Sequence, residues 1–400
     1  MSSGYEPKRP LLIANVKPMA FGQATSDGVV DVLIGADGRI AEVGPSLAVS
    51  ADVERIDGKG AWMSPGWIDL HVHIWHGGTD ISLRPSECGV ERGVTTLVDA
   101  GSAGEANFHG FREYIIEPAR ERIKAFLNLG SIGLVACNRV SELIDIRSID
   151  FDRMLQVYAD NSEHIVGIKV RASHVITGSW GITPVKLGKK IAKILKIPMM
   201  VHVGEPPALY DEVLEVLGPG DIVTHCFNGK AGSSIMEDED LFDLAERCAG
   251  EGIRLDIGHG GASFSFRVAE AAIKRGLLPF SISTDLHNRS LNFPVWDLAT
   301  TMSKLLSVDM PFEKVIEAVT HAPASAIKLP LINRLAVGER AEFTIFDLVE
   351  SDIEAVDSMG DTAMLKQLFE PRYAVIGSEA VAASRYIPRA RKLTPHGHGH

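Results

Sequence analysis

The middle of the chain alternates short apolar stretches with longer amphipathic ones. Each apolar stretch has the length of a strand, and most precede residues with apolar side chains at helical spacing, as in LYDEVLEVLG and EDLFDLAERCAGEG. Such alternation is typical of a parallel sheet covered by helices on both faces. The eight predicted strands are GWIDLHVH (66–73), TTLVDAG (95–101), AFLNLGSIG (125–133), VGIKVRA (166–172), MMVHVG (199–204), DIVTHCF (221–227), RLDIGHG (254–260) and FSISTDL (280–286).

The number of these units predicts a closed barrel. Eight strand–helix units over about 260 residues match a (β/α)8 TIM barrel, which usually takes about 250 residues. A doubly wound open sheet is the alternative, and it favours a glycine-rich phosphate-binding turn after its first strand. In this chain histidines occupy that turn. We therefore expect an α/β protein with a TIM barrel over residues 65–332.

Both flanks of the predicted barrel are rich in short strands instead. Before the barrel, LLIANVK and VVDVLIGADGRIAEVG have strand patterns, and ADGR is typical of a hairpin turn. After the last helix, LAVGERAEFTIFDLVE and RYAVIGSEAVAAS resume strand-like alternation. We expect residues 1–64 and 333–393 to form one small composite β-sandwich domain, and residues 394–400 to be a disordered tail.

Composition excludes several classes of protein. The chain is 45% hydrophobic and 23% charged, as soluble globular proteins are, and its net charge of −12 opposes nucleic-acid binding. No stretch approaches the roughly 20 apolar residues that cross a bilayer, and the N-terminus lacks the apolar core of a signal peptide. The four cysteines lack CxxC spacing. We expect a cytoplasmic protein with neither a membrane nor a nucleic-acid partner.

The first predicted barrel strand ends in two histidines, His71 and His73. Alternate side chains of a strand share a face, so both rings point the same way. A lone histidine at this place would be explained by core packing, but other strands add groups of similar chemistry. These are Lys169 in the fourth strand, His202 in the fifth, His225 late in the sixth and Asp285 late in the eighth. Because barrel enzymes gather their chemistry at the carboxyl ends of the strands, we expect the six side chains to converge there.

The residue types of this set favour a metal site. Imidazole and carboxylate groups are ligands of zinc and similar cations. A protonated lysine would repel a cation, but burial lowers a lysine pKa and makes the neutral amine available. A neutral Lys169 amine can add carbon dioxide and become a carbamate, an anionic ligand with two oxygens that can bridge two metals. An ion-paired or snorkelling lysine is the structural alternative.

This set of motifs resembles the amidohydrolase superfamily of metal-dependent hydrolases. The resemblance rests on the HVH strand end, the lysine of strand four, the histidines of strands five and six, and the aspartate in STDLH. GAWMSPGWID and LAVGERAEFTIFD resemble the entry to that family's barrel and its return to the sheet domain. Four further segments are most similar to the branch that deacetylates acyl-amino acids and acyl esters, whose members are often labelled dihydroorotase or adenine deaminase: GIKVRAS, VHVGEPP, THCFNG and DIGHGGASF.

The resemblance implies two Zn2+ ions per subunit. His71, His73 and Asp285 would hold one ion, and His202 and His225 the other. N6-carboxylated Lys169 and a hydroxide would bridge the two. The hydroxide would attack the substrate carbonyl, and Asp285 would take its proton and return it to the leaving group.

Other residues near the predicted strand ends are candidates for substrate contact. Arg171 shares a strand face with Lys169 and has a fork of donors that suits a carboxylate; a structural ion pair at the barrel rim is the alternative. The remaining candidates are Asn228 after strand six, His259 after strand seven, His287 after strand eight and Trp180 in the loop after strand four. For the last of these, ordinary packing is the competing interpretation.

These observations favour a hydrolase that removes an acetyl group from an acetylated hydroxy acid or N-acetyl amino acid. The resemblance leaves three alternatives: a cyclic amide hydrolase similar to dihydroorotase, an aminohydrolase similar to adenine deaminase, and a non-catalytic scaffold. A scaffold of this family would lose metal ligands, whereas all six positions are filled here. We expect the partners to be a small acylated substrate and further copies of the chain in a homo-oligomer.

Overall fold

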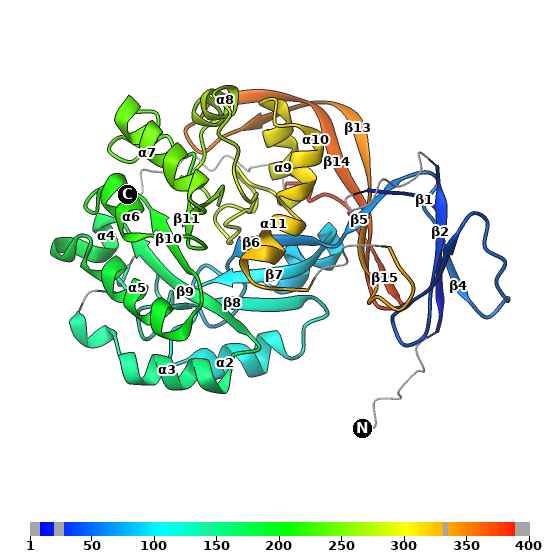
Figure 1. Ribbon diagram of the computed structural model, residues 1–400, viewed down its shortest axis with the longest axis horizontal. Helices are drawn as coiled ribbons and strands as arrows, with labels where there is room; N and C mark the ends of the chain where they lie inside the picture. The colour runs from blue at the N-terminus through cyan, green and yellow to red at the C-terminus, as the bar shows by residue number, and fades with distance from the viewer. Residues whose placement is uncertain (1–8, 20–27, 138, 144, 331–334, 389–400) are drawn as a thin grey trace, which may run out of the picture.

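The computed structural model describes residues 9–19, 28–137, 139–143, 145–330 and 335–388. Figure 1 shows a curled parallel sheet surrounded by helices, with a separate β-rich part beside it. The predicted tail over 394–400 lies outside the described residues. No helix in the described ranges combines the length and apolar character that membrane crossing requires.

The barrel sheet contains seven regular parallel strands in sequential order, from β6 to β12. Every residue of β6 and β7 is buried, as expected for strands covered on both faces. Their bounds are β6 Trp67–Val72, β7 Val94–Ala100, β8 Arg122–Asn128, β9 Ile165–Ala172, β10 Met199–Val203, β11 Ile222–Thr224 and β12 Arg254–Asp256.

An irregular eighth segment completes the barrel in place of the strand predicted over residues 280–286. Ser281 forms an isolated parallel bridge to Asp256 of β12, and Leu286 forms one to Val72 of β6. Between these bridges the backbone leaves the extended region, since Asp285 has a φ of +48°. The (β/α)8 barrel prediction is confirmed, but the regular eighth strand was wrong because a positive φ interrupts the ladder.

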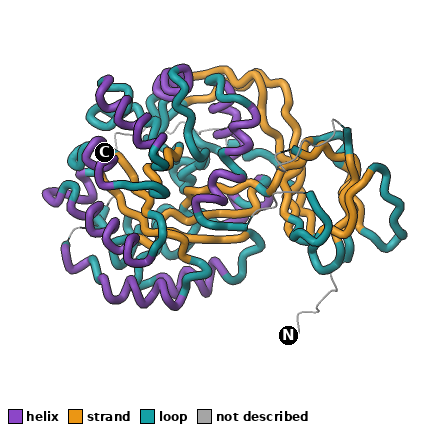
Figure 2. Tube along the Cα trace, in the orientation of Figure 1, coloured by secondary structure: helices purple, strands orange, loops and turns teal. Residues whose placement is uncertain are grey.

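Helices follow the strands and cover the outside of the barrel (Figure 2). Several begin at an aspartate that accepts a backbone N–H three residues later; Asp297, which precedes α9, accepts from Thr300 at 2.7 Å. The helices are α1 Pro85–Cys88, α2 Phe108–Phe111, α3 Phe151–Asp160, α4 His174–Thr177, α5 Thr183–Leu195, α6 Tyr210–Val216, α7 Glu239–Gly250, α8 Phe266–Lys274, α9 Leu298–Ser307, α10 Phe312–Glu317 and α11 His321–Ala326, with short turns η1 Val90–Arg92, η2 Arg112–Ile116, η3 Ile146–Ser148 and η4 Gly178–Trp180.

The β-rich part joins strands from both ends of the chain in one sheet. The order along this sheet is β15-β14-β13-β5-β1-β2-β3, and β4 pairs with β1. The bounds are β1 Leu11–Pro18, β2 Val30–Ile34, β3 Ile40–Gly44, β4 Glu54–Asp57, β5 Trp62–Pro65, β13 Glu342–Val356, β14 Thr362–Ile376 and β15 Glu379–Ala382. Strands before and after the barrel therefore pair with each other, as the alternation in the two flanks predicts.

The long β13–β14 hairpin extends from this sheet along the barrel (Figure 1). Aromatic contacts fix it there: Trp67 lies 5.2 Å from Phe346, and Phe312 stacks on Phe369 at 5.7 Å between ring centroids. Each such pair contributes about 1 kcal/mol beyond the area that it buries. The tip of the hairpin reaches the loops that follow the barrel strands, because Ser358 N donates to Phe264 O at 3.0 Å.

Candidate metal centre and substrate cavity

The six predicted ligand residues come together at the carboxyl ends of the barrel strands. His71 is in β6 and His73 follows it, Lys169 is in β9, His202 is in β10, His225 follows β11 directly, and Asp285 is in the irregular eighth segment. Five of them line one cavity of about 480 Å³. The sixth, His225, lies behind His202, with their ring centroids 4.3 Å apart.

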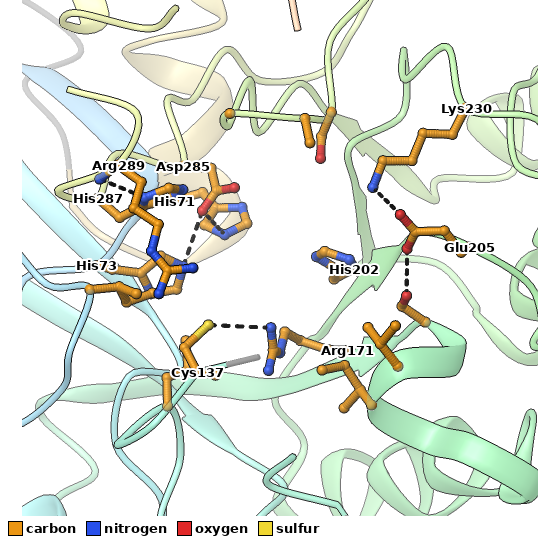
Figure 3. Close-up of a pocket in the computed structure, with 18 of the residues that line it drawn as sticks. His71, His73, Cys137, Arg171, His202, Glu205, Lys230, Asp285, His287 and Arg289 are labelled. Carbon is orange, nitrogen blue, oxygen red and sulfur yellow. Dashed lines mark hydrogen bonds and ion pairs between the residues drawn. The ribbon is translucent and has the colours of Figure 1, made fainter. Parts of the chain in front are cut away.

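Asp285 connects two of the histidines with one oxygen. Its Oδ1 lies 3.3 Å from His71 Nε2 and 3.1 Å from His73 Nε2, as Figure 3 shows. Lys169 Nζ lies 3.2 Å from the same His71 nitrogen. Two strands and the eighth segment thus present four ligand-type groups within hydrogen-bonding range of a neighbour in the cluster.

A second cluster is formed by His202 and His225. His225 Nε2 lies 2.8 Å from His202 Nδ1, a distance that a shared proton or a shared cation can bridge. Ligand atoms of His71, His225 and Asp285 lie within 4.8 Å of one another, so the two clusters adjoin. The donor set, imidazole nitrogens with a carboxylate, is the kind that zinc prefers.

Hydrogen bonds to the Nδ1 atoms of His71 and His225 fix which ring nitrogen carries the proton. His225 Nδ1 lies 2.6 Å from Gly258 O, and a carbonyl only accepts, so this nitrogen carries the proton. Thr224 donates its one hydroxyl proton to Asp256 at 2.7 Å, so at 2.9 Å it accepts from His71 Nδ1–H. In both rings the Nε2 lone pair therefore faces the cavity side, as a metal ligand requires.

Buried carboxylates that were not among the predicted residues support these rings. Asp256 accepts from Ser281 and Ser283 besides Thr224, Asp99 accepts from the amides of Ile74 and Ser102, and Asp69 ties β6 to Thr284 at 2.6 Å. Burial raises the pKa of all three, that of Asp69 to about 7. A signal existed in the sequence, since each is a carboxylate inside a predicted barrel strand.

Burial also dominates the electrostatics of the ligand residues. It lowers the pKa of Lys169 to about 8 and that of His225 to about 4, and it holds the pKa of His71 and His202 well below the usual histidine value. Burial alone would raise the pKa of Asp285, but the neighbouring rings of His71 and His73 outweigh it and keep the carboxyl ionised. The rings of His71, His202 and His225 are thus favoured in neutral, ligand-competent forms, and the Lys169 amine loses its proton more readily than an exposed lysine does.

Two of the six residues have strained backbones. His225 has a φ of +70° and Asp285 a φ of +48°, a region that non-glycine residues enter at a cost of about 1–3 kcal/mol. His225 lies directly after β11, and Asp285 lies directly before the bridge formed by Leu286. The turn of the backbone brings these side chains back over the strand ends, which side-chain alternation alone does not predict.

Arg171 lines the cavity with its guanidinium in a buried ion pair. Its Nε and Nη2 each lie 2.7 Å from an oxygen of Glu142, and its Nη1 lies 3.7 Å from Cys137 Sγ (Figure 3). Burial raises the pKa of the Cys137 thiol, so this sulfur is a poor nucleophile. The ion-pair alternative for Arg171 is thus present, and the arginine also faces the cavity.

Two other cations line the cavity and were not predicted. Lys230 donates to Glu205 at 2.8 Å, and Ser173 donates to the other oxygen of that carboxylate at 2.7 Å. Burial opposes ionisation of Glu205, but these donors lower its pKa to about 2. Arg289 lies by His287 on the opposite side of the cavity (Figure 3). No strand pattern marks these loop residues in the sequence.

The other predicted substrate contacts separate into two groups. His287 lines the cavity. Asn228 is fully buried and its amide bonds to His225 O and Ser233 O, His259 is fully buried beside Lys304, and Trp180 lies half-buried in η4; these three are outside the set of cavity-lining residues. Packing within loops accounts for the positions of Asn228 and His259.

Known proteins similar to this chain agree on one family. Residues 62–381 match the amidohydrolase family. A deacetylase of Brucella anthropi is 80% identical over 400 residues, which cover all of this chain and 99% of that protein. A solved structure described as a dihydroorotase is 79% identical, with a TM-score of 0.93 over 95% of this chain and all of that one.

The proteins similar to this chain are described by different activities. A further solved structure, described as an adenine deaminase, is 36% identical, with a TM-score of 0.85 over 94% of this chain and all of that one. The names agree on hydrolytic chemistry and differ on the substrate. The chain belongs to the amidohydrolase family and is a hydrolytic enzyme.

Proposed function

We propose that the protein is a binuclear zinc deacetylase that acts on a small ester or amide carrying a carboxylate. The observation that carries this proposal is the convergence of His71, His73, His202, His225, Lys169 and Asp285, with outer ring nitrogens already held by protein acceptors. His73 completes that pattern, since its Nδ1 lies 3.0 Å from Ser102 Oγ. Such support is typical of rings that ligate metals.

The residues divide naturally between two cations. His71, His73 and Asp285 would hold one, His202 and His225 the other, and carboxylated Lys169 would stand between them. Lys169 is 1% exposed and its neutral form is favoured by burial, so its amine can react with carbon dioxide to give a carbamate and release a proton. The carbamate would balance part of the cationic charge in the buried site.

Bound zinc supplies a water that ionises near neutral pH and a Lewis acid for the substrate carbonyl. The chain contributes the proton transfer. Asp285, 14% exposed and beside His71 and His73, accepts the proton of the attacking water and returns it to the leaving oxygen or nitrogen. The bond from the acyl carbon to that leaving atom breaks, and acetate and the free hydroxy or amino acid result.

The cavity suits a small acid with one apolar substituent. Ile81, Leu134, Ile176 and Phe293 supply apolar lining. Arg171 supplies a positive charge for a carboxylate, which would compete with Glu142 for its Nε and Nη2 donors. The deacetylase name of the 80% identical relative supports acetyl as the acyl group that is removed. A cyclic amide hydrolase is the second candidate, supported by the dihydroorotase description of the 79% identical structure, and the same metal chemistry would serve it.

A substrate panel with metal analysis tests the proposal. Zinc-loaded protein would be offered N-acetyl and O-acetyl acids of both hands, dihydroorotate, hydantoins and adenine. We expect near two zinc ions per chain and the highest kcat/KM on an acetylated acid. Turnover of dihydroorotate alone would establish the second candidate, and full activity in protein stripped of metal would reject both.

A further inference from the structure

A lysine outside the cavity lies fully buried beneath the loop that follows β12. Lys304, in α9, is 0% exposed and makes three contacts: His259 Nε2 at 2.9 Å, Pro294 O at 2.8 Å and Val356 O at 2.8 Å. A buried lysine is costly unless its donors are satisfied, and three acceptors match the three N–H groups of an ammonium. The proposed chemistry uses neither Lys304 nor His259.

The contacts of His259 determine where its proton lies. Its Nδ1 lies 2.9 Å from Gly260 O, and only an N–H can approach a carbonyl so closely, so Nδ1 is protonated. The Nε2 atom is then unprotonated and can only accept, so it accepts from a Lys304 N–H. His259 is thus a neutral ring clamped between Lys304 and its own loop, and it stacks on Phe264 at 4.7 Å.

This loop supplies one of the contacts that orient the proposed metal ligands. Gly258 O accepts from His225 Nδ1 at 2.6 Å, and an added Cβ at Gly260 would meet Asp285 Oδ2 at 2.5 Å. The next three residues, Gly261, Ala262 and Ser263, line the cavity. A displacement of the 258–263 segment would therefore affect three things together: the hydrogen bond to His225, the backbone beside Asp285, and one wall of the cavity.

The tip of the β13–β14 hairpin holds the same loop from the other side. Ser358 Oγ donates to Gly260 O at 3.0 Å, and Asp357 Oδ2 accepts from Phe266 N at 2.9 Å. Val356, the last residue of β13, is also one of the three acceptors of Lys304. Lys304 and the hairpin tip thus both contact the loop that follows β12. They do so although α9, β13 and this loop are far apart in the sequence.

We propose that Lys304 and Ser358 are positioning residues that hold the 258–263 loop in the conformation that orients His225 and forms one wall of the cavity. The consequence for catalysis rests on the proposed metal function. The conformational part does not, because it concerns the loop in the protein without metal. A purely structural lysine would stabilise the whole fold without a specific effect on this loop.

Hydrogen exchange of the metal-free protein tests the conformational part. The amides of Gly258, His259 and Gly260 donate to Ser283 Oγ, Ser283 O and Thr284 O, so they report on loop opening. We expect Lys304→Met to raise their exchange rates at least tenfold through local opening, and Ser358→Ala to raise them less. Ser303→Ala is the matched control, since it removes another α9 bond to the hairpin, 3.0 Å to Phe369 N, without touching His259.

Binding of Co2+ tests the consequence of the loop conformation for the proposed metal site. With Co2+ as the probe, Lys304→Met should shift the visible absorption bands and weaken metal affinity by about 10–100-fold, as losses behind metal ligands do, while Ser303→Ala should not. Equal exchange and equal spectra in Lys304→Met and Ser303→Ala would overturn the proposal. Failure of the unsubstituted protein to bind Co2+ would instead reject the metal function, and the exchange comparison would still decide the role of the loop.

Discussion

The two sides of the cavity are built differently. On the side of the proposed metal centre, ring nitrogens and carboxylates come from strand ends and are oriented by buried hydrogen bonds, such as those of Thr224 and Gly258. On the substrate side, Arg171, Lys230 and Arg289 come from one strand and two loops, and at least two of them already face a carboxylate. The first side fixes a chemistry, whereas the second can change with the loops. Such a division lets one metal-dependent chemistry serve different substrates.

Asp285→Asn should have the largest effect, because it removes the proposed proton carrier on the metal side. We expect kcat to fall by about 10³-fold or more with the fold retained, since a positioned general base contributes 10²–10⁴-fold. Steady-state kinetics and circular dichroism measure this. Asp243→Asn, on the surface of α7, is the control. Turnover near the normal rate would remove Asp285 from the proton transfer.

Lys169→Ala should rank next, because it deletes the proposed bridge between the cations. We expect the variant to lose at least half of its bound metal and most of its activity, and short carboxylic acids to restore part of both by filling the carbamate position. Metal analysis with and without added acetate or propionate measures this, and Lys190→Ala, on the surface of α5, is the control. Unchanged metal content would exclude Lys169 from the centre.

Thr224→Val tests whether buried hydrogen bonds orient the proposed metal ligands. It keeps the shape of the residue and removes the acceptor of His71 Nδ1. We expect metal affinity to fall by about 10–100-fold, the usual cost of losing a partner behind a ligand. Competition with a chromophoric chelator measures the affinity. Thr320→Val is the matched control, since it also removes a buried threonine hydroxyl, one that donates to Ile316 O and lies outside the set of cavity-lining residues. An affinity equal to that of the unsubstituted protein would show that His71 is oriented by other contacts.

Arg171→Met should have the smallest and most selective effect, because it acts on the substrate side. We expect KM for a carboxylate substrate to rise by about tenfold, the worth of one charge-assisted hydrogen-bond pair, with little change in kcat. The neutral methyl ester of the same substrate is the control, and its KM should not change. Equal effects on acid and ester would assign Arg171 to structure alone, through Glu142.

The sequence predicts the barrel and the ligand-type residues because both follow from periodicity. Apolar strands recur between amphipathic helices, and side chains at strand ends must meet at one edge of a closed sheet. The family match confirms the fold class and the hydrolase. The backbone turns at His225 and Asp285 could not be predicted, since positive φ values there depend on tertiary contacts that outweigh local preference.

The substrate side was harder to predict for a related reason. Lys230 and Glu205 lie on separate loops after β10 and β11, and only the folded chain brings their side chains within 2.8 Å. His259 shows the converse, since a glycine-rich loop histidine next to a strand end resembles a substrate contact, yet its ring turns inward to Lys304. Loop position follows from long-range packing, which no local pattern encodes.

The ion pairs at the mouth also determine how a charged molecule arrives. Since Arg171 faces Glu142 and Lys230 faces Glu205, positive potential is largely cancelled before it extends into solvent. In a chain of net charge −12, an anion therefore diffuses in without long-range attraction. Capture of such an anion would then not weaken as ionic strength rises, because salt only screens the repulsion. Selection would occur after contact, when an incoming carboxylate competes with a resident one for the same guanidinium.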